Sequence, residues 1–216
     1  MAAHSDDEVL GCGGTIAKHV ANGDRVSVVF MTDGVGSRVD NNKKDAVVRN
    51  TSSQRALSTL SISNSYQFDF PDNNMDSVPL LEVVQKLEQV IDKVQPSVVY
   101  THYAHDLNVD HRITHQAVMT ACRPQAQSSV KEIYTFEVLS STEWASKANC
   151  QFLPLLIVDI SDCWELKLKA LKCYHGEMRK FPHSRSYEAV EALALLRGST
   201  HGVGKAEAFF VERIIK

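Results

Sequence analysis

The sequence predicts an α/β fold: a mostly parallel sheet flanked by helices, Rossmann-like in outline. Short β-branched runs alternate with longer segments of helical periodicity. A polar, histidine-rich stretch also follows one of the expected strands, and in such sheets functional residues collect at the carboxyl ends of strands. The length of 216 residues suits one domain with its own core, so we expect a single domain over residues 1–216.

The elements follow from hydrophobic periodicity and breakers. Residues 9–21 suit a first helix, and the run VSVVFMT at 26–32 is typical of a buried strand. Residues 78–94 carry an apolar stripe at helical spacing, which Pro96 ends. The remaining elements are expected as strands at 97–102, 132–139, 153–160 and 207–215 (the last a strand or strand-like edge), and as helices at 110–122, 162–180 and 186–196.

Two segments depart from regular structure. Residues 33–46 are glycine-rich and polar directly after a strand, which favours a mobile loop. A strand should also precede the first polar cluster, but only residues 1–3 stand there. We therefore expect a first strand that is very short or missing.

Composition excludes several functional classes. The net charge is −3 without a basic run, which argues against nucleic-acid binding. No apolar stretch is long enough for a membrane span, and residues 1–10 do not read as a signal peptide. The five cysteines form no CxxC pair, which favours reduced thiols and a cytoplasmic location. The oligomeric state stays open, and a homo-oligomer is compatible with the sequence.

The first polar cluster is HSDDE at residues 4–8. His4 and Asp7 are ordinary ligands for a divalent metal. A carboxylate beside such a metal without binding it, as we expect for Asp6, is suited to act as a general base. The alternative is a plain acidic helix N-terminus, because Asp and Glu favour the first helical turn.

The second cluster, THYAHDLNVDHRITH at 101–115, follows an expected strand and holds four of the nine histidines. Together with His4 and Asp7, His111 would complete two imidazoles and one carboxylate. Three protein ligands plus water is a catalytic zinc arrangement, and the same donors also hold Fe²⁺ or another divalent metal. His111 and His115 at i, i+4 form an alternative metal pair, although Arg112 stands where zinc proteases have glutamate.

The chain resembles a known family at this point. AHSDDE (3–8) is similar to the AHPDDE signature of the LmbE/PIG-L-like zinc N-deacetylases, and DLNVDHR (106–112) resembles their second signature, D-x-[H/N]-x-D-H. FPDNNMD (70–76) and the tail at 182–213 also look like this family, particularly its bacterial sugar-modifying members. The resemblance runs over essentially the whole chain.

The resemblance implies a Rossmann-like fold, one catalytic Zn²⁺ and removal of the acetyl group from an N-acetylated amino sugar or glycoconjugate. By motif position, His4, Asp7 and His111 would be the metal ligands and Asp6 the general base. Relatives often carry an oxyanion-stabilising histidine where this chain has Asn108. An amide can donate a hydrogen bond to an oxyanion but cannot shuttle a proton.

Other residues are assigned more loosely. The resemblance suggests Arg49, Arg112, His183 and Arg185 as sugar-binding residues, although exposed polar residues are common on any surface. Asp106 and Asp110 either orient a ligand histidine or cap the helix that begins near His111. Ser5 replaces the usual proline of the signature, which should loosen the turn slightly.

Three other functions compete with deacetylation. GCGG at 11–14 faintly suggests nucleotide binding, but its spacing is not GxGxxG. Metal-assisted hydrolysis of another bond, such as a phosphate ester, would use similar ligands. A catalytically inactive relative would keep the fold and lose the chemistry.

Overall fold

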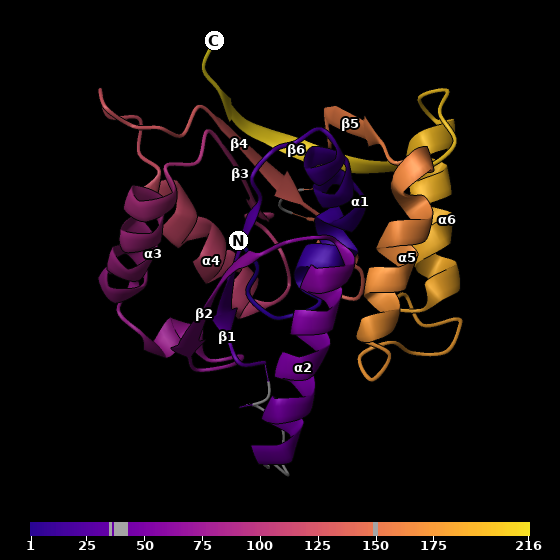
Figure 1. Cartoon of the computed structure of the whole chain (residues 1–216), viewed down its shortest axis with the longest axis horizontal. Helices are drawn as coiled ribbons and strands as arrows, with labels where there is room; N and C mark the ends of the chain where they lie inside the picture. Colours follow the sequence, from indigo (N-terminus) through magenta and orange to yellow (C-terminus); the bar gives the residue numbers. More distant parts are fainter. Residues whose placement is uncertain (35, 37–42, 149–150) are drawn as a thin grey trace.

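The computed structural model describes residues 1–34, 36, 43–148 and 151–216, and Figure 1 shows its arrangement. Helices flank both faces of a central sheet, so the predicted α/β class is confirmed. The strands are β1 (Ser27–Thr32), β2 (Asn64–Phe70), β3 (Val98–His102), β4 (Glu132–Phe136), β5 (Leu156–Asp159) and β6 (Ala206–Ile214). The helices are α1 (Asp7–Ala21), α2 (Lys43–Thr59), α3 (Leu80–Val94), α4 (Val109–Ala121), α5 (Trp164–Cys173) and α6 (Tyr187–Ser199), with short 3₁₀ turns η1 (Met75–Ser77), η2 (Thr142–Trp144) and η3 (Ser161–Cys163).

The sheet is parallel at one end and antiparallel at the other. β1 pairs with β2 and β3 pairs with β4, both in parallel. β6 runs antiparallel to β4 and to β5 and lies between them, in the order β3-β4-β6-β5. The last strand is therefore an interior strand and not a sheet edge, because it pairs with a neighbour on each side.

Residues 1–3 join the two parts of the sheet, as the short first strand that the sequence predicts. Ala2 bridges to Phe30 in parallel, and the Ala2 N–H donates to the Val29 carbonyl at 2.8 Å. On the other side the Met1 amino group donates to the Tyr100 carbonyl at 2.7 Å. The residues that follow, beginning with His4, therefore leave the sheet between the carboxyl ends of β1 and β3.

Side chains of the central strands alternate between two cores. From β1, Phe30 packs with α1, α2, α5 and α6, whereas Met31 packs with α3 and α4. From β4, Phe136 packs in the same core as Phe30, and Ile133 packs in the same core as Met31. A strand whose two faces are both buried reads as a continuous apolar run, which is the pattern of VSVVFMT. Figure 1 shows α3 and α4 on one side of the sheet and α1, α5 and α6 on the other.

Several boundaries differ from the sequence prediction. The helix expected over 162–180 ends at Cys173, because the backbone of Tyr174 leaves the α region and its hydroxyl bonds to Glu8 of α1. The sequence analysis predicted neither α2, which has few apolar residues, nor β2, although Tyr66, Phe68 and Phe70 alternate with polar residues as in a half-buried strand. A loop was expected over residues 33–46, but α2 begins at Lys43, so residues 43–46 are helical. Residues 35 and 37–42 lie outside the described part of the chain.

Within the described part of the chain, no helix combines the length and the apolar character needed to cross a membrane.

Candidate functional site

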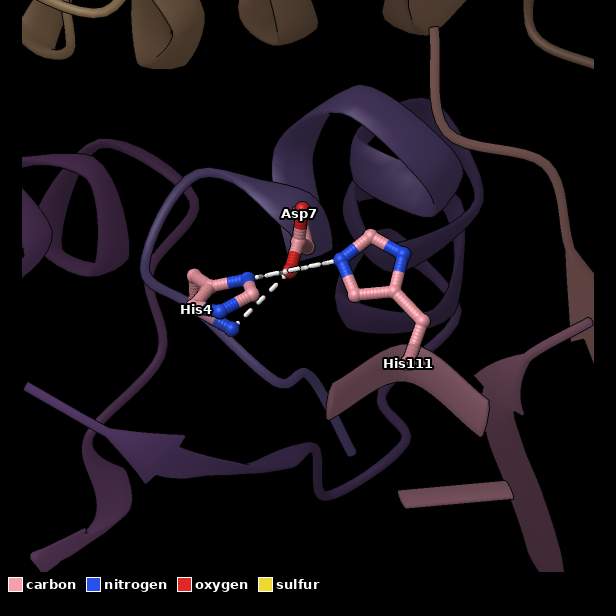
Figure 2. A group of neighbouring side chains, drawn as sticks. All are labelled: His4, Asp7 and His111. Atoms are coloured by element: carbon pink, nitrogen blue, oxygen red, sulfur yellow. Dashed lines mark hydrogen bonds and ion pairs between the residues drawn. The ribbon is translucent and has the colours of Figure 1, made fainter. Parts of the chain in front are cut away.

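Three side chains from the two polar clusters converge on one point. His4 Nδ1 lies 3.2 Å from Asp7 Oδ2, and His111 Nε2 lies 3.3 Å from both of those atoms. All three residues are buried. Figure 2 shows both imidazole rings directing a nitrogen at the Asp7 carboxylate from opposite sides. The structure thus brings together the predicted ligands, which are more than 100 positions apart in the chain.

The spacing of these atoms fits a tetrahedral metal site. Zinc binds imidazole nitrogen and carboxylate oxygen at about 2.0–2.2 Å, so two ligand atoms on a tetrahedron lie roughly 3.3–3.5 Å apart. The three observed separations agree with this value closely. His4, Asp7 and His111 also form one of the two groups of potential metal ligands found among the described residues. The site therefore fits one small divalent cation with a remaining open position.

The local fold explains why these ligands meet. His4 follows the short first strand, Asp7 opens α1, and His111 lies in the first turn of α4, which follows β3. The carboxyl ends of neighbouring parallel strands share one sheet edge, where α/β proteins bind ligands. Asp7 and Glu8 do stand in the first turn of α1, so the acidic helix start and the metal site coexist.

The outer nitrogen of each ligand imidazole faces carboxylates. His4 Nε2 lies 3.0 Å from Asp110 Oδ2 and 3.3 Å from Asp72 Oδ1. His111 Nδ1 lies 3.1 Å from Asp106 Oδ1. An acceptor at the outer nitrogen favours a proton there and leaves the inner nitrogen free for a metal. These contacts match the orienting role considered for Asp106 and Asp110.

Asp110 and Asp106 are themselves fixed by further bonds. Asp110 accepts backbone N–H groups of Asn73 at 2.6 Å and Met75 at 3.0 Å. Asp106 accepts the hydroxyl hydrogens of Ser141 and Thr142 from the η2 turn. The second group of potential ligands, His4 with Asp72 and Asp110, therefore coincides with the partners of the outer His4 nitrogen.

The carboxylates shift the pKa values of the ligands. Burial disfavours a charged His111, but the charge of Asp7 and the contact with Asp106 outweigh it and raise the His111 pKa to about 9. Burial likewise opposes ionisation of Asp7, yet the charge and hydrogen bond of His111 hold the pKa of Asp7 well below its usual range. Without a metal the site is therefore an ion-pair network, in which His111 carries a proton at neutral pH.

Asp6 lies beside the ligands and does not join them. Its Oδ2 accepts a hydrogen bond from Arg185 at 3.0 Å, and Arg49 approaches Oδ1 at 3.5 Å. Among the described residues no group donates a hydrogen bond to Oδ1, although this atom is buried. Burial raises the pKa of Asp6, while the two arginines act in the opposite direction. The arrangement leaves one carboxylate oxygen with capacity to accept a proton.

Asn108 is the N-cap of α4. Its Oδ1 accepts the backbone N–H groups of Asp110 at 2.8 Å and of His111 at 3.4 Å. Its Nδ2 donates to Asn73 Oδ1 at 2.9 Å, which leaves the second amide hydrogen. The helix cap is thus made by Asn108 and not by Asp106 or Asp110.

The arginines expected at a pocket rim differ in accessibility. Arg49 is only 9% exposed and binds Ser5 through the hydroxyl at 3.0 Å and the carbonyl at 2.8 Å. The serine hydroxyl thereby ties the turn in place where relatives use proline. Arg112 donates to the carbonyls of Asp106 and Leu107. Arg49 and Arg112 therefore mainly support the loops around the site.

His183 and Arg185 share one loop near Asp6. The Arg185 N–H donates to His183 Nδ1 at 3.0 Å, and the guanidinium contacts both Asp6 and Ser140. The His183 ring meets the half-exposed Trp144 edge to face, with centroids 5.5 Å apart.

The alternative ligand His115 turns away from the metal site. Its Nδ1 faces the His102 carbonyl at 2.9 Å, and it belongs to neither group of potential ligands among the described residues. His102 instead stacks on His111 with ring centroids 3.8 Å apart, and its Nε2 accepts the Ala3 N–H at 2.8 Å.

Sequence reasoning did not single out three residues that touch the site. Asp72 contacts the outer nitrogen of His4, although its segment FPDNNMD had been noted as family-like. Glu8 accepts the Asp6 N–H at 2.9 Å and the Tyr174 hydroxyl at 2.6 Å. The position of Glu8 within HSDDE was a signal, whereas nothing in the sequence around Tyr174 connects it to residues 166 positions earlier.

The glycine-rich stretch after the first cluster is occupied by a protein carboxylate. α1 is interrupted at Cys12, and the backbone N–H groups of Gly14 and Thr15 donate to Glu207 at 2.8 and 2.7 Å. Lys167 pairs with the same carboxylate at 2.6 Å. Glu207 thus fills the place that a phosphate would take in a nucleotide-binding protein.

Comparisons with known proteins agree with this geometry. Residues 1–122 match the family model described as PIG-L: GlcNAc-PI de-N-acetylase. The chain is similar to the uncharacterized deacetylase YaiS of Escherichia coli (strain K12), at 30% identity over 179 residues, covering 80% of this chain and 86% of the relative. It is also 27% identical over 218 residues to a 4-oxalmesaconate hydratase of Pseudomonas putida, covering 92% of this chain and 78% of the relative.

A solved structure shares the fold over nearly the whole chain. The N,N'-diacetylchitobiose deacetylase from Pyrococcus horikoshii superimposes with a TM-score of 0.79 at 24% identity, covering 98% of this chain and 82% of that chain. The matched segment 1–122 contains both polar clusters and all three converging ligands. On these grounds the chain belongs to the PIG-L family.

Proposed function

We propose that this protein is a metal-dependent hydrolase that removes the acetyl group from an N-acetylated amino sugar or glycoconjugate, with zinc as the metal. The observation that carries the proposal is the convergence of His4 Nδ1, Asp7 Oδ2 and His111 Nε2 beside a carboxylate that does not join them. The deacetylases among the family relatives support the choice of an acetamide as the substrate.

The metal would supply Lewis acidity, polarising the acetyl carbonyl and lowering the pKa of a water molecule. Asp6 would accept the proton of that water through Oδ1 and later pass it to the leaving amine. Arg185 holds Oδ2, so the proton-accepting oxygen keeps a fixed direction. The second amide hydrogen of Asn108 would donate to the developing oxyanion.

Residues around the site would bind the sugar and support the reacting groups. We assign sugar contacts to His183 and Arg185, because their loop lies against Asp6 and is partly exposed. Arg49 and Arg112 would act on the sugar through the loops that they brace, or directly once the substrate is bound. Asp106 and Asp110 would orient the ligand imidazoles.

We also propose a substrate class and a cellular location for this reaction. The partner is a small N-acetyl amino sugar or glycoconjugate. We place the reaction in the cytoplasm, because the cysteines within the described residues are free.

The test is an assay of purified, zinc-loaded protein with free N-acetylglucosamine, diacetylchitobiose and N-acetylglucosamine glycosides, measuring acetate release. Metal-stripped protein is the matched control. Acetate release that disappears with the metal and returns with zinc supports the proposal. Hydrolysis of a phosphate ester, or hydration of an unsaturated tricarboxylate as the name of the Pseudomonas relative indicates, with no acetate release would contradict it. Inactivity on all substrates would favour the inactive relative.

A further inference from the structure

Asp6 has an unusual backbone conformation for a residue at the start of a helix. Its φ is 119° and its ψ is −30°, whereas an N-cap residue normally has β-region dihedrals. A positive φ of this size lies outside the left-handed region that non-glycine residues occasionally adopt. Such conformations persist only where the surroundings impose them, and they concentrate at functional sites.

Hydrogen bonds on both sides of Asp6 impose this conformation. On the N-terminal side, the Asp6 N–H donates to Glu8 Oε2 at 2.9 Å. On the C-terminal side, the Asp6 carbonyl accepts the N–H groups of Val9 and Leu10 at 3.1 and 2.9 Å, which ties it to α1. The helix thus fixes one peptide. The other is held by the Glu8 carboxylate at the Asp6 N–H and by Arg49, which donates to the Ser5 carbonyl at 2.8 Å.

Glu8 is held in turn by Tyr174. The Tyr174 hydroxyl donates to Glu8 Oε1 at 2.6 Å. Glu8 is 3% exposed and Tyr174 1% exposed, so water does not compete for these bonds. Tyr174 directly follows α5, which packs against α1. The chain of contacts therefore runs from the end of α5 through Glu8 to the backbone of Asp6.

We propose that Glu8 and Tyr174 are positioning residues for the reaction: together they hold the backbone of Asp6 in its positive-φ conformation and so direct its carboxylate to the reacting water. Neither residue reaches the metal ligands through any contact described above. The inference rests on the proposed function, because it assigns Asp6 the role of general base. A misplacement of about 1 Å in a catalytic group can cost roughly a hundredfold in rate.

The test compares Glu8→Ala, Glu8→Gln and Tyr174→Phe. Glu8→Ala removes the acceptor of the Asp6 N–H, whereas Glu8→Gln keeps an oxygen at the same place. Tyr174→Phe keeps the ring and removes only the hydroxyl. Tyr134→Phe is the matched control, because Tyr134 is also buried and its hydroxyl also donates to a glutamate, Glu132.

The positioning role predicts a specific pattern for acetate release. Glu8→Ala should lower kcat about a hundredfold and Tyr174→Phe about tenfold, with KM and zinc content unchanged. Glu8→Gln should stay within about threefold of the wild type, as should Tyr134→Phe. Unchanged kcat in both Glu8→Ala and Tyr174→Phe would overturn the inference. So would a parallel loss of zinc, because Glu8 would then support the whole loop.

A structural readout makes the test independent of activity. Crystal structures of the zinc-loaded variants should show Asp6 with positive φ in Glu8→Gln and with negative φ in Glu8→Ala. Asp6 retaining its φ in Glu8→Ala would overturn the inference. If Glu8→Ala does not fold, the structure and kcat of Tyr174→Phe decide alone. A wild type that releases no acetate would refute the proposed function, whereas the backbone of Asp6 in these variants would still decide the positioning claim.

Discussion

Two buried charge clusters lie along α1, and they differ in where the positive charge comes from. At the start of the helix, His4, Asp7 and His111 direct their metal-binding atoms at one another. At the break near Cys12, Glu207 receives two backbone N–H groups and the Lys167 ammonium group. The second cluster takes its positive charge from a lysine, whereas the first, without a metal, takes it from a proton on His111 that a metal ion would replace.

This difference separates a structural cluster from a functional one. A buried carboxylate with a lysine and backbone donors is balanced and needs no ligand. Imidazole and carboxylate groups at tetrahedral spacing can instead exchange a bound proton for a divalent cation. Removing charge should therefore affect metal binding at the first cluster and stability at the second.

The largest effect is expected from His111→Ala. Loss of one of three ligands should reduce zinc from about one per chain to near zero and abolish acetate release. Elemental analysis of the purified variant measures this directly. His115→Ala is the control, because His115 faces the His102 carbonyl, and it should keep its zinc. Zinc retained by His111→Ala would mean that the ligands are wrongly assigned.

Asp6→Asn should lower kcat by about 10²- to 10⁴-fold and leave zinc content unchanged, because it removes the proton acceptor and no ligand. Steady-state kinetics measures the predicted loss of kcat, and metal analysis of the same preparation measures the zinc content. A variant with nearly full activity would exclude Asp6 as the base.

Lys167→Met should show the opposite pattern. It leaves the buried Glu207 without its cation, and we expect a loss of about 3–5 kcal/mol in the free energy of unfolding. Denaturant unfolding of the metal-free protein measures it, with the exposed Lys18→Met as the control. Zinc per folded chain should not change. A variant as stable as the wild type would contradict the structural role of this cluster.

Asp106→Asn should weaken zinc binding about 10- to 100-fold, because Asp106 faces the outer nitrogen of His111. Competition with a zinc chelator measures the affinity. Asp24→Asn is a matched control, since Asp24 pairs with His19 at 2.7 Å on the surface, and it should leave the affinity unchanged. Equal affinities for the two variants would argue against the orienting role.

The last expected effect is a pH dependence of zinc binding, which needs no substitution. The pKa of His111 in the metal-free protein is about 9, above the unfolded value of about 6.5, so its ion pairs stabilise the fold below pH 6.5 and are lost as pH rises through 9. Zinc must displace this proton, and carboxylates also raise the pKa of His4 against the effect of burial, so affinity should rise at least tenfold per pH unit up to about 9. Calorimetry in buffers of different ionisation enthalpy counts the released proton. Affinity independent of pH between 7 and 9 would refute this linkage.

Local pattern predicted the parts of the fold that are locally determined. The apolar run at 26–32 and the helical stripe at 78–94 correspond to β1 and α3 within two residues. By contrast, β2 is short and largely exposed, and the alternation of Tyr66, Phe68 and Phe70 with polar residues is its only local signal. Just after the end of α5, Tyr174 donates to Glu8 of α1, a contact that no local pattern contains.

The candidate site could also be predicted only in part from local sequence. The ligand residues could be named from two motifs, because histidine and aspartate cluster visibly in the sequence. Their partners could not, since Asp72 reaches His4 from the loop after β2 and Arg185 reaches Asp6 from 179 positions away. Only the fold brings these side chains together.

The most direct test of the metal site is a crystal structure of the zinc-soaked protein with anomalous scattering measured at the zinc edge. We predict one ion at about 2.0–2.2 Å from His4 Nδ1, Asp7 Oδ2 and His111 Nε2, with Asp6 outside its coordination sphere. An ion held instead by His4, Asp72 and Asp110, or by His111 and His115, would contradict it, as would a fully soaked crystal without a zinc peak at this site.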